Sequence, residues 1–171
     1  MLKLFLPDEY VKSIFEIQPK DLIEKGIKGI ITDLDNTLVA WNEAHANDRV
    51  HQWFKDMEDH GIAVTIISNN KKDRVELFST PLKRPFVYQA KKPLKRSFVK
   101  AAKMMNLERH EVVVIGDQVM TDVLGGNRAG FPTILVVPIV ETDDKITKFN
   151  RRIERIILHK LEKQGLLKWE K

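Results

Sequence analysis

The sequence contains no cysteine in its 171 residues. Disulfide bonds, thiolate metal ligands and a cysteine nucleophile are therefore excluded, and the redox compartment is left undetermined. Long apolar runs are missing too: none approaches the roughly 20 residues that a membrane-spanning helix needs, and residues 1–7 are too few for a signal peptide. We expect a cytoplasmic protein, either soluble or bound to the periphery of a membrane.

Acidic residues are fewer than basic ones. Lys and Arg number 29 against 24 for Asp and Glu, and the net charge of +5 favours a polyanionic partner such as a phosphate ester, an anionic lipid or a nucleic acid. No recognisable nucleic-acid-binding motif is present, so no specific nucleic acid is expected. The length, without repeats or linkers, predicts a single domain over residues 1–171 and leaves the oligomeric state open.

Apolar residues alternate between strand and helix spacing along the chain. Residues 7–25 favour two short helices, residues 27–138 a core of alternating strands and helices, and residues 142–164 a long closing helix. The alternation predicts a three-layer, doubly wound α/β domain with a parallel sheet and right-handed crossovers. Five core strands are expected, at residues 27–32, 62–67, 86–88, 111–115 and 133–137.

Four of these strands are followed by polar side chains of complementary chemistry. In chain order they are Asp33 and Asp35, then Ser68, then Lys92, then Asp117 with Asp122. Carboxyl ends of parallel strands face one crevice, and carboxylates without histidine or thiol are hard ligands that suit Mg²⁺. A lysine and a hydroxyl at the same place would neutralise and position phosphoryl oxygens. The set therefore indicates magnesium-assisted phosphoryl transfer.

These residues resemble the four motifs of the haloacid-dehalogenase-like (HAD) phosphatases. The motifs correspond to Asp-Leu-Asp-Asn-Thr-Leu at 33–38, to Ser68, to Lys92 before Pro93, and to Gly116-Asp117 with Asp122. The amino-acid sequence around the first motif most resembles the YqeG-like proteins of subfamily IIIA, whose relatives include mitochondrial phosphatidylglycerophosphatases. The resemblance covers residues 6–138 and leaves the closing helix outside it.

The resemblance implies a role for each acidic residue. Asp33 would attack phosphorus and become an aspartyl-phosphate. Asp35 would protonate the leaving alkoxide and then activate water, which requires a raised pKa. Mg²⁺ would be held by the Asp33 side chain, the Asp35 main-chain carbonyl and Asp117. Asp122 would orient the lysine or a metal-bound water, although as a plain helix cap it would serve structure alone.

The other motif positions are expected to contact the phosphoryl group. Three polar side chains would hydrogen-bond it: Thr37, Ser68 and Asn69. Lys92 would screen its charge; Lys91 is an alternative because it too could point inward, but the position next to Pro93 matches the motif better. Ser68 has a second interpretation as a simple cap of the next helix.

Spacing leaves no room for a cap domain, the insertion with which relatives enclose small substrates. One loop and one helix fill the segment between Thr37 and Ser68, and one helix and one strand fill that between Lys92 and Asp117. An open site shielded only by the loop 39–47 suits a phosphate on something bulky, such as a lipid, a protein, a nucleic-acid end or a large sugar. The resemblance makes phosphatidylglycerophosphate the first substrate to expect.

The closing helix has a basic amphipathic pattern. One stripe consists of Ile146, Phe149, Ile153, Ile156, Ile157 and Leu161, and the opposite side carries Lys148, Arg151, Arg152, Arg155 and His159. In one interpretation, the slightly favoured one, the stripe packs on the sheet and the charges face water. In the other, the basic face meets anionic lipid as a peripheral membrane contact.

Two other functions compete with a phosphatase. A receiver-type phosphorylation switch also carries acidic residues at strand ends, but it would place its acceptor aspartate after the third strand, and none follows residues 86–88. Asp35, two residues after Asp33, favours turnover instead. A basic nucleic-acid-binding module is the other alternative, and no motif supports it.

Overall fold

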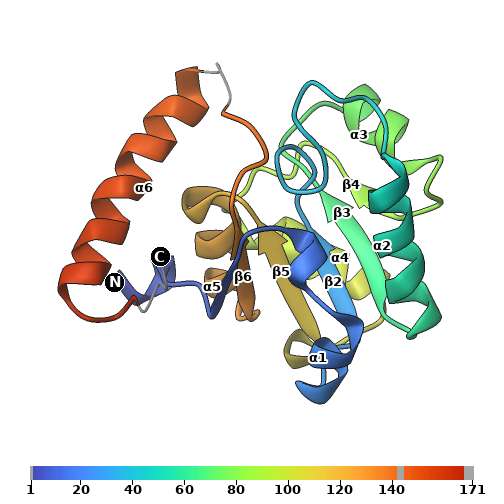
Figure 1. Cartoon of the computed structure of the whole chain (residues 1–171), viewed down its shortest axis with the longest axis horizontal. Helices are drawn as coiled ribbons and strands as arrows, with labels where there is room; N and C mark the ends of the chain where they lie inside the picture. The colour runs from blue at the N-terminus through green and yellow to red at the C-terminus, as the bar shows by residue number, and fades with distance from the viewer. Residues whose placement is uncertain (1, 142–144, 168–171) are drawn as a thin grey trace.

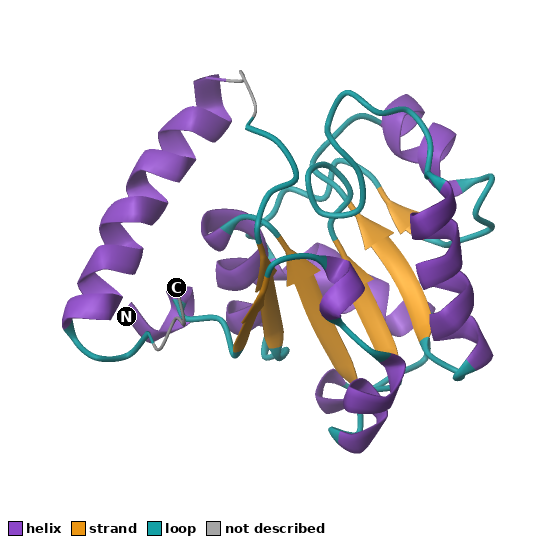
Figure 2. Ribbon diagram, in the orientation of Figure 1, coloured by secondary structure: helices purple, strands orange, loops and turns teal. Residues whose placement is uncertain are grey.

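The computed structural model describes residues 2–141 and 145–167 and has a parallel sheet with helices on both faces (Figures 1 and 2). The six strands are β1 (Glu9–Val11), β2 (Gly29–Thr32), β3 (Ala63–Ile67), β4 (Phe86–Val87), β5 (Val112–Gly116) and β6 (Thr133–Val136). Their order in the sheet is β1-β6-β5-β2-β3-β4, and every neighbouring pair is parallel. The predicted doubly wound α/β fold and its five core strands are confirmed.

Two helical layers cover the sheet. The helices are α1 (Pro19–Glu24), α2 (Asp48–Asp59), α3 (Lys72–Ser79), α4 (Lys95–Met104), α5 (Leu124–Ala129) and α6 (Lys145–Lys163). The chain also contains short helical turns, among them η1 (Leu2–Phe5) before β1 and η4 (Val119–Val123) before α5. Side chains from α1, α2 and α3 form one apolar core with one face of the sheet, and those from α4 and α5 form a second core with the other face.

Helical spacing of large apolar side chains accounts for the way α2 and α4 pack. On α2, Val50, Trp53, Phe54 and Met57 recur at intervals of three or four and are all buried. The helix starts where the Asn47 side chain accepts a hydrogen bond from the Val50 N–H at 3.0 Å. A single α-helix thus spans the distance between β2 and β3, and α4 does the same between β4 and β5, so the described residues contain no cap domain.

The prediction of a first short helix within residues 7–25 was wrong. Residues 9–11 form the edge strand β1 against β6, and Ile14–Glu16 is only a 3₁₀ turn. Asp8 anchors the pairing, because its main chain donates to the Thr133 carbonyl and its carboxylate accepts from the Thr133 N–H. This partner lies far along the chain, and its ladder outweighs the local helical spacing. The second predicted helix is present as α1.

Helix α6 lies at the end of the molecule next to β6 and α5 (Figure 1), where it contacts η1 and η4. Residues 142–144 of the predicted helix lie outside the described residues, as does the Ile146 side chain. The expectation that the apolar stripe packs on the sheet was wrong for Phe149 and Ile156. Phe149 is 64% exposed and Ile156 is 53% exposed, whereas Leu161, near the C-terminal end of the helix, is buried. Both sheet faces are already covered by α1 to α5, so the stripe finds no sheet to pack against.

Among the described residues, the helices are all too short or too polar to cross a bilayer.

Candidate active site

The predicted site residues come together at the carboxyl edge of the sheet. Strand β2 lies between β3 and β5, with Thr32 in register with Ile66 on one side and Ile115 on the other. The Asp33 N–H extends the ladder by donating to the Ile115 carbonyl at 2.9 Å. This register places the residues after β2, β3 and β5 at one level.

A tight turn after β2 shapes the first motif. Asn36 has a φ of +63°, a left-handed conformation that asparagine tolerates better than most residues. The turn directs the Thr37 hydroxyl inward, 3.4 Å from Asp33 Oδ2 and 3.2 Å from Asp117 Oδ1. Asp33, Thr37 and Asp117 therefore meet at one point, as expected from the motif spacing.

Lys92 is the lysine that faces the site. Its Nζ lies 2.6 Å from Asp33 Oδ1 and 2.7 Å from Asp122 Oδ1, and its side chain is only 3% exposed. Burial by itself lowers the pKa of Lys92, but Asp122 and Asp33 outweigh it, so the pKa is raised and the amine stays charged. Lys91 is exposed and adopts a φ of +54°, which removes it as the alternative.

Asp122 contacts Lys92, as one of its predicted roles requires, but its predicted role as a helix cap was wrong, since no side-chain hydrogen bond caps η4 or α5. One carboxylate oxygen binds Lys92, and the other accepts a hydrogen bond from the Gln118 N–H at 3.1 Å. A Cβ at position 116 would overlap the Asp122 carboxyl group, so Gly116 is required at the end of β5. Burial, opposed by Lys92 and assisted by Asp33, raises the pKa of Asp122 to about 6.

The carboxylates form a cluster that fits a divalent cation. Ligand oxygens of Asp33, Asp117 and Asp122 lie within 4.8 Å of one another, all three residues being buried. Lys92 occupies one oxygen each of Asp33 and Asp122, so Asp33 Oδ2 and Asp117 Oδ1 remain turned toward each other around Thr37. Burial raises the pKa of Asp117 well above its usual range, as do Asp33 and Asp122, and Arg151 opposes them. An all-oxygen set without histidine suits a hard ion such as Mg²⁺.

Asp35 has partners that the sequence did not reveal. Its Oδ1 accepts from Arg74 Nη2 at 2.9 Å and Nε at 3.2 Å, and its Oδ2 accepts from Asn70 Nδ2 at 3.3 Å. Burial and the nearby Asp33 nevertheless raise the pKa of Asp35 against the effect of Arg74 and Asn70. The only available signal was that Arg74 lies in the first turn of α3, the helix that follows β3 in the chain.

Ser68 and Asn69 bind the main chain in this structure. The Ser68 hydroxyl accepts from the Asn70 N–H at 3.0 Å, as a local cap would. The Asn69 amide accepts from the Lys92 N–H at 2.7 Å and donates to the Lys92 carbonyl at 3.3 Å. Asn69 therefore holds the loop that carries Lys92, a role not anticipated from its expected contact with phosphate.

Arg151 is a further member of the site, and its predicted place on the outer basic face of α6 was wrong. Its Nη2 lies 2.5 Å from Asp117 Oδ2, and its Nη1 donates to the Asp117 carbonyl at 3.1 Å. Nη1 also lies 3.6 Å from Glu154 Oε2. Burial, more than any partner, raises the pKa of Glu154. Nothing in the motif pattern pointed to Arg151, because the resemblance ends before α6.

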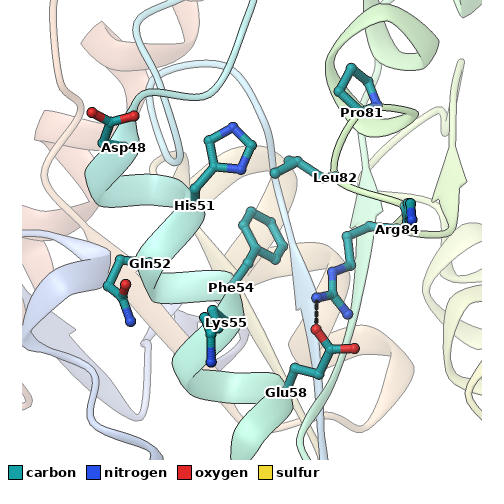
Figure 3. A pocket seen from close by; sticks show the side chains of 10 residues that line it. Asp48, His51, Gln52, Phe54, Lys55, Glu58, Pro81, Leu82 and Arg84 are labelled. Atoms are coloured by element: carbon teal, nitrogen blue, oxygen red, sulfur yellow. Dashed lines mark hydrogen bonds and ion pairs between the residues drawn. The ribbon is translucent and has the colours of Figure 1, made fainter.

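A hollow of about 350 Å³ lies elsewhere, between α2 and residues 81–84 (Figure 3). Phe54 forms its floor, and Arg84 spans it to reach Glu58 Oε2 at 2.7 Å. None of the strand-end side chains lines it, so it is separate from the candidate active site.

Comparison with known proteins decides the family. A family model described as HAD-hydrolase-like matches residues 89–163, which include α6. The probable phosphatase YqeG of Bacillus subtilis (strain 168) is 55% identical over 168 residues, covering 98% of both chains. The chain belongs to the haloacid-dehalogenase-like phosphatase family. This HAD-type phosphatase is also 29% identical to phosphatidylglycerophosphate phosphatase 1 of Arabidopsis thaliana, over 94% of its own length and 49% of the relative's.

Solved structures show the same fold for this HAD-type phosphatase at low identity. The cobalt-bound deoxy-D-mannose-octulosonate 8-phosphate phosphatase of Haemophilus influenzae superposes with a TM-score of 0.55 at 18% identity, over 82% of this chain and 91% of that one. A putative 3-deoxy-D-manno-octulosonate 8-phosphate phosphatase of Vibrio cholerae gives 0.51 at 17% identity, over 88% and 93%.

The buried carboxylates predict a pH-dependent stability without added cation. A carboxyl whose folded pKa is raised stabilises the fold below its unfolded pKa, and this contribution is lost as pH rises through the folded pKa. For Asp122 that window runs from about pH 4 to about pH 6, and Asp117 shifts in the same direction. Chemical denaturation in EDTA should therefore show that wild type loses unfolding free energy relative to Asp117→Asn as pH rises above about 4, because the variant lacks the contribution of Asp117 and keeps that of Asp122. Parallel pH profiles of the two proteins would contradict the prediction.

Proposed function

We propose that the protein is a magnesium-dependent phosphomonoesterase that acts through an aspartyl-phosphate on a bulky phosphate ester, with phosphatidylglycerophosphate as the first candidate. One observation carries the reaction type. The Asp33 carboxylate lies at the carboxyl edge of the sheet with Lys92 on one oxygen and the Thr37 hydroxyl beside the other. A carboxylate held in this way is positioned to attack a phosphorus atom whose oxygens are screened by Lys92.

The reaction would proceed in two displacements. Asp33 forms a bond to phosphorus as the ester P–O bond breaks, and Asp35 gives its proton to the leaving oxygen. Asp35 then takes a proton from water, which attacks the phosphorus of the aspartyl-phosphate, releases inorganic phosphate and restores Asp33. The raised pKa of Asp35 supports its role as the acid. Since Arg74 and Asn70 occupy its oxygens, Asp35 has to exchange one of them for the leaving group.

The Asp33 side chain, the Asp35 main-chain carbonyl and Asp117 would hold the Mg²⁺ ion. When bound, the ion supplies positive charge against the phosphoryl oxygens and the clustered carboxylates. Lys92 also supplies positive charge against the phosphoryl oxygens, from the Oδ1 side of Asp33. It keeps its proton throughout, because its pKa is raised.

Two observations support a lipid substrate. Apolar side chains are exposed in the loops after β2, β4 and β6, at the same edge as Asp33; they are Trp41, Tyr88, Leu94, Ile139 and Val140. The α6 stripe around Phe149 and Ile156 is exposed as well, with the exposed bases Arg152 and Arg155 on the same helix. Apolar and basic groups together suit the surface of an anionic membrane, where a phosphorylated headgroup would reach the open site.

The two catalytic aspartates are separable by mutation. Asp33→Asn removes the attacking oxygen and should reduce turnover by roughly three orders of magnitude on every substrate. Asp35→Asn should slow turnover of alkyl phosphates about a hundredfold, and less for activated aryl phosphates, whose leaving groups need no proton. Steady-state phosphate release measures both variants. Near wild-type turnover by Asp33→Asn would exclude the mechanism.

Magnesium should be required for turnover. Chelation by EDTA should abolish phosphate release and Mg²⁺ should restore it, because Asp33 and Asp117 repel each other and the substrate without the ion. Asp117→Asn should raise the Mg²⁺ concentration for half-maximal activity by about tenfold or more. The matched control is Asp73→Asn, an exposed aspartate of α3, which should leave that concentration unchanged. Full activity of wild type in EDTA would refute the requirement.

The membrane part of the proposal is tested with vesicles. Phosphate release from phosphatidylglycerophosphate in anionic vesicles should exceed release from soluble sugar, nucleotide and peptide phosphates. Phe149→Ser combined with Ile156→Ser should reduce sedimentation with anionic vesicles about tenfold, since it removes buried apolar area from the membrane contact. Leu77→Ser, at a 49% exposed position on α3, is the control. Equal sedimentation of all three proteins, or faster release from a soluble ester, would leave a soluble bulky phosphate as the substrate.

A further inference from the structure

Helix α6 docks through a face that is half polar. Its inward residues are Arg151, Glu154, Leu158 and Leu161, spaced three or four apart on one side of the helix. Leu158 packs against Val119, Val123 and Leu135, and Leu161 is fully buried. One end of the docked face is therefore apolar, and the other reaches the active site.

The polar end of this face is attached to the fourth motif. Glu154 Oε1 accepts a hydrogen bond from the Met120 N–H at 3.1 Å. The Arg151 guanidinium donates hydrogen bonds to both the carboxylate and the carbonyl of Asp117. The hydrogen bond to the carboxylate is charge-assisted and therefore stronger than one between neutral groups, and the second bond, to the carbonyl, fixes the orientation of the guanidinium. Among the described ion pairs, that between Arg151 and Asp117 is the one that ties α6 to the aspartate cluster.

Asp117 is thus shared between two cation positions. Its Oδ2 is taken by Arg151, and its Oδ1 faces Thr37 and Asp33, where the cluster fits a divalent ion. Since both positions are on one buried carboxylate, a divalent ion held by Oδ1 would repel the guanidinium on Oδ2. The same ion also withdraws from Asp117 the negative charge that attracts Arg151.

We infer that Arg151 is a positioning residue that makes the docking of α6 and the binding of the divalent cation at Asp117 mutually opposed. The inference deepens the proposed function, since it rests on the cation site of that reaction. By linkage, a docked α6 weakens cation affinity, and the cation weakens docking by the same factor. The apolar contacts of Leu158 and Leu161 keep the helix attached when Arg151 dissociates from Asp117.

Because α6 docking and cation binding oppose each other, the position of α6 depends on whether the site holds a cation. In the docked state Arg151 offsets part of the negative charge of Asp117. When the ion is bound, Arg151 no longer binds Asp117, and α6 is held only by the apolar contacts of its C-terminal half. The helix would then respond to the loading of the site although it supplies no ligand to the ion.

Cation affinity is the first measurement. Titration calorimetry with Mg²⁺ alone, without substrate, should show Arg151→Gln binding about tenfold more tightly than wild type. Arg155→Gln, an exposed arginine on the same helix, removes an equal charge and should bind as wild type does. Leu161→Ala, which loosens docking and keeps Arg151, should also bind more tightly, by a smaller factor. This last variant separates the docking of α6 from the mere loss of a positive charge.

Hydrogen exchange is the second measurement. Addition of Mg²⁺ should decrease protection of the amides of residues 151–161 in wild type and in Arg155→Gln. In Arg151→Gln, protection should already be low and should not change with Mg²⁺.

Two results would overturn the inference: equal or weaker Mg²⁺ binding by Arg151→Gln, or an increase in the protection of α6 on addition of Mg²⁺. Neither would affect the proposed function so long as Mg²⁺ binds and supports phosphate release. Tighter binding by Arg151→Gln in a protein that releases no phosphate would support the inference and remove the proposed function. Absence of Mg²⁺ binding in all variants would remove both.

Discussion

The burial of three aspartates at one edge of the sheet is the constraint on which the rest of the site depends. Asp33, Asp117 and Asp122 lie within 4.8 Å of one another, where ionised carboxylates repel and are poorly hydrated. Such a group is stabilised either by protonation, which the raised pKa values of Asp117 and Asp122 favour, or by nearby cations. Lys92 arrives from the loop after β4 and Arg151 from α6, so the positions of both are consequences of the acidic cluster.

The sequence predicted the parts of this arrangement that depend on strand ends. An apolar run that stops at a carboxylate locates both a strand and the side chain delivered at its end, and this logic placed Asp33, Asp117 and Lys92 at one edge. Edge strand β1 escaped prediction, because its three residues are stabilised by pairing with β6, a partner more than a hundred residues away. The spacing of apolar residues within a short segment gives no information about a partner so far away in the chain.

The residues missed at the site share a different cause. Arg74 and Arg151 reach the aspartates along long side chains from helices, so their sequence positions obey the helix pattern and give no sign of the target. Asn69 was associated with the right place but binds the main chain of Lys92. Motif spacing identifies which residues gather at the site, whereas side-chain reach and the competition for partners decide which of them touch.

The cations of the cluster also differ in how firmly they are held. The Lys92 side chain is 3% exposed and binds two aspartates at once, so its removal would take the ion pair from two buried carboxylates. The Arg151 side chain is 23% exposed and belongs to a helix packed on the domain through a short apolar anchor. One cation is therefore built into the fold and the other can be exchanged. A site that must accept a divalent ion and a phosphate needs both kinds, because a permanent lysine keeps the nucleophile oriented while a replaceable arginine leaves an oxygen to be shared.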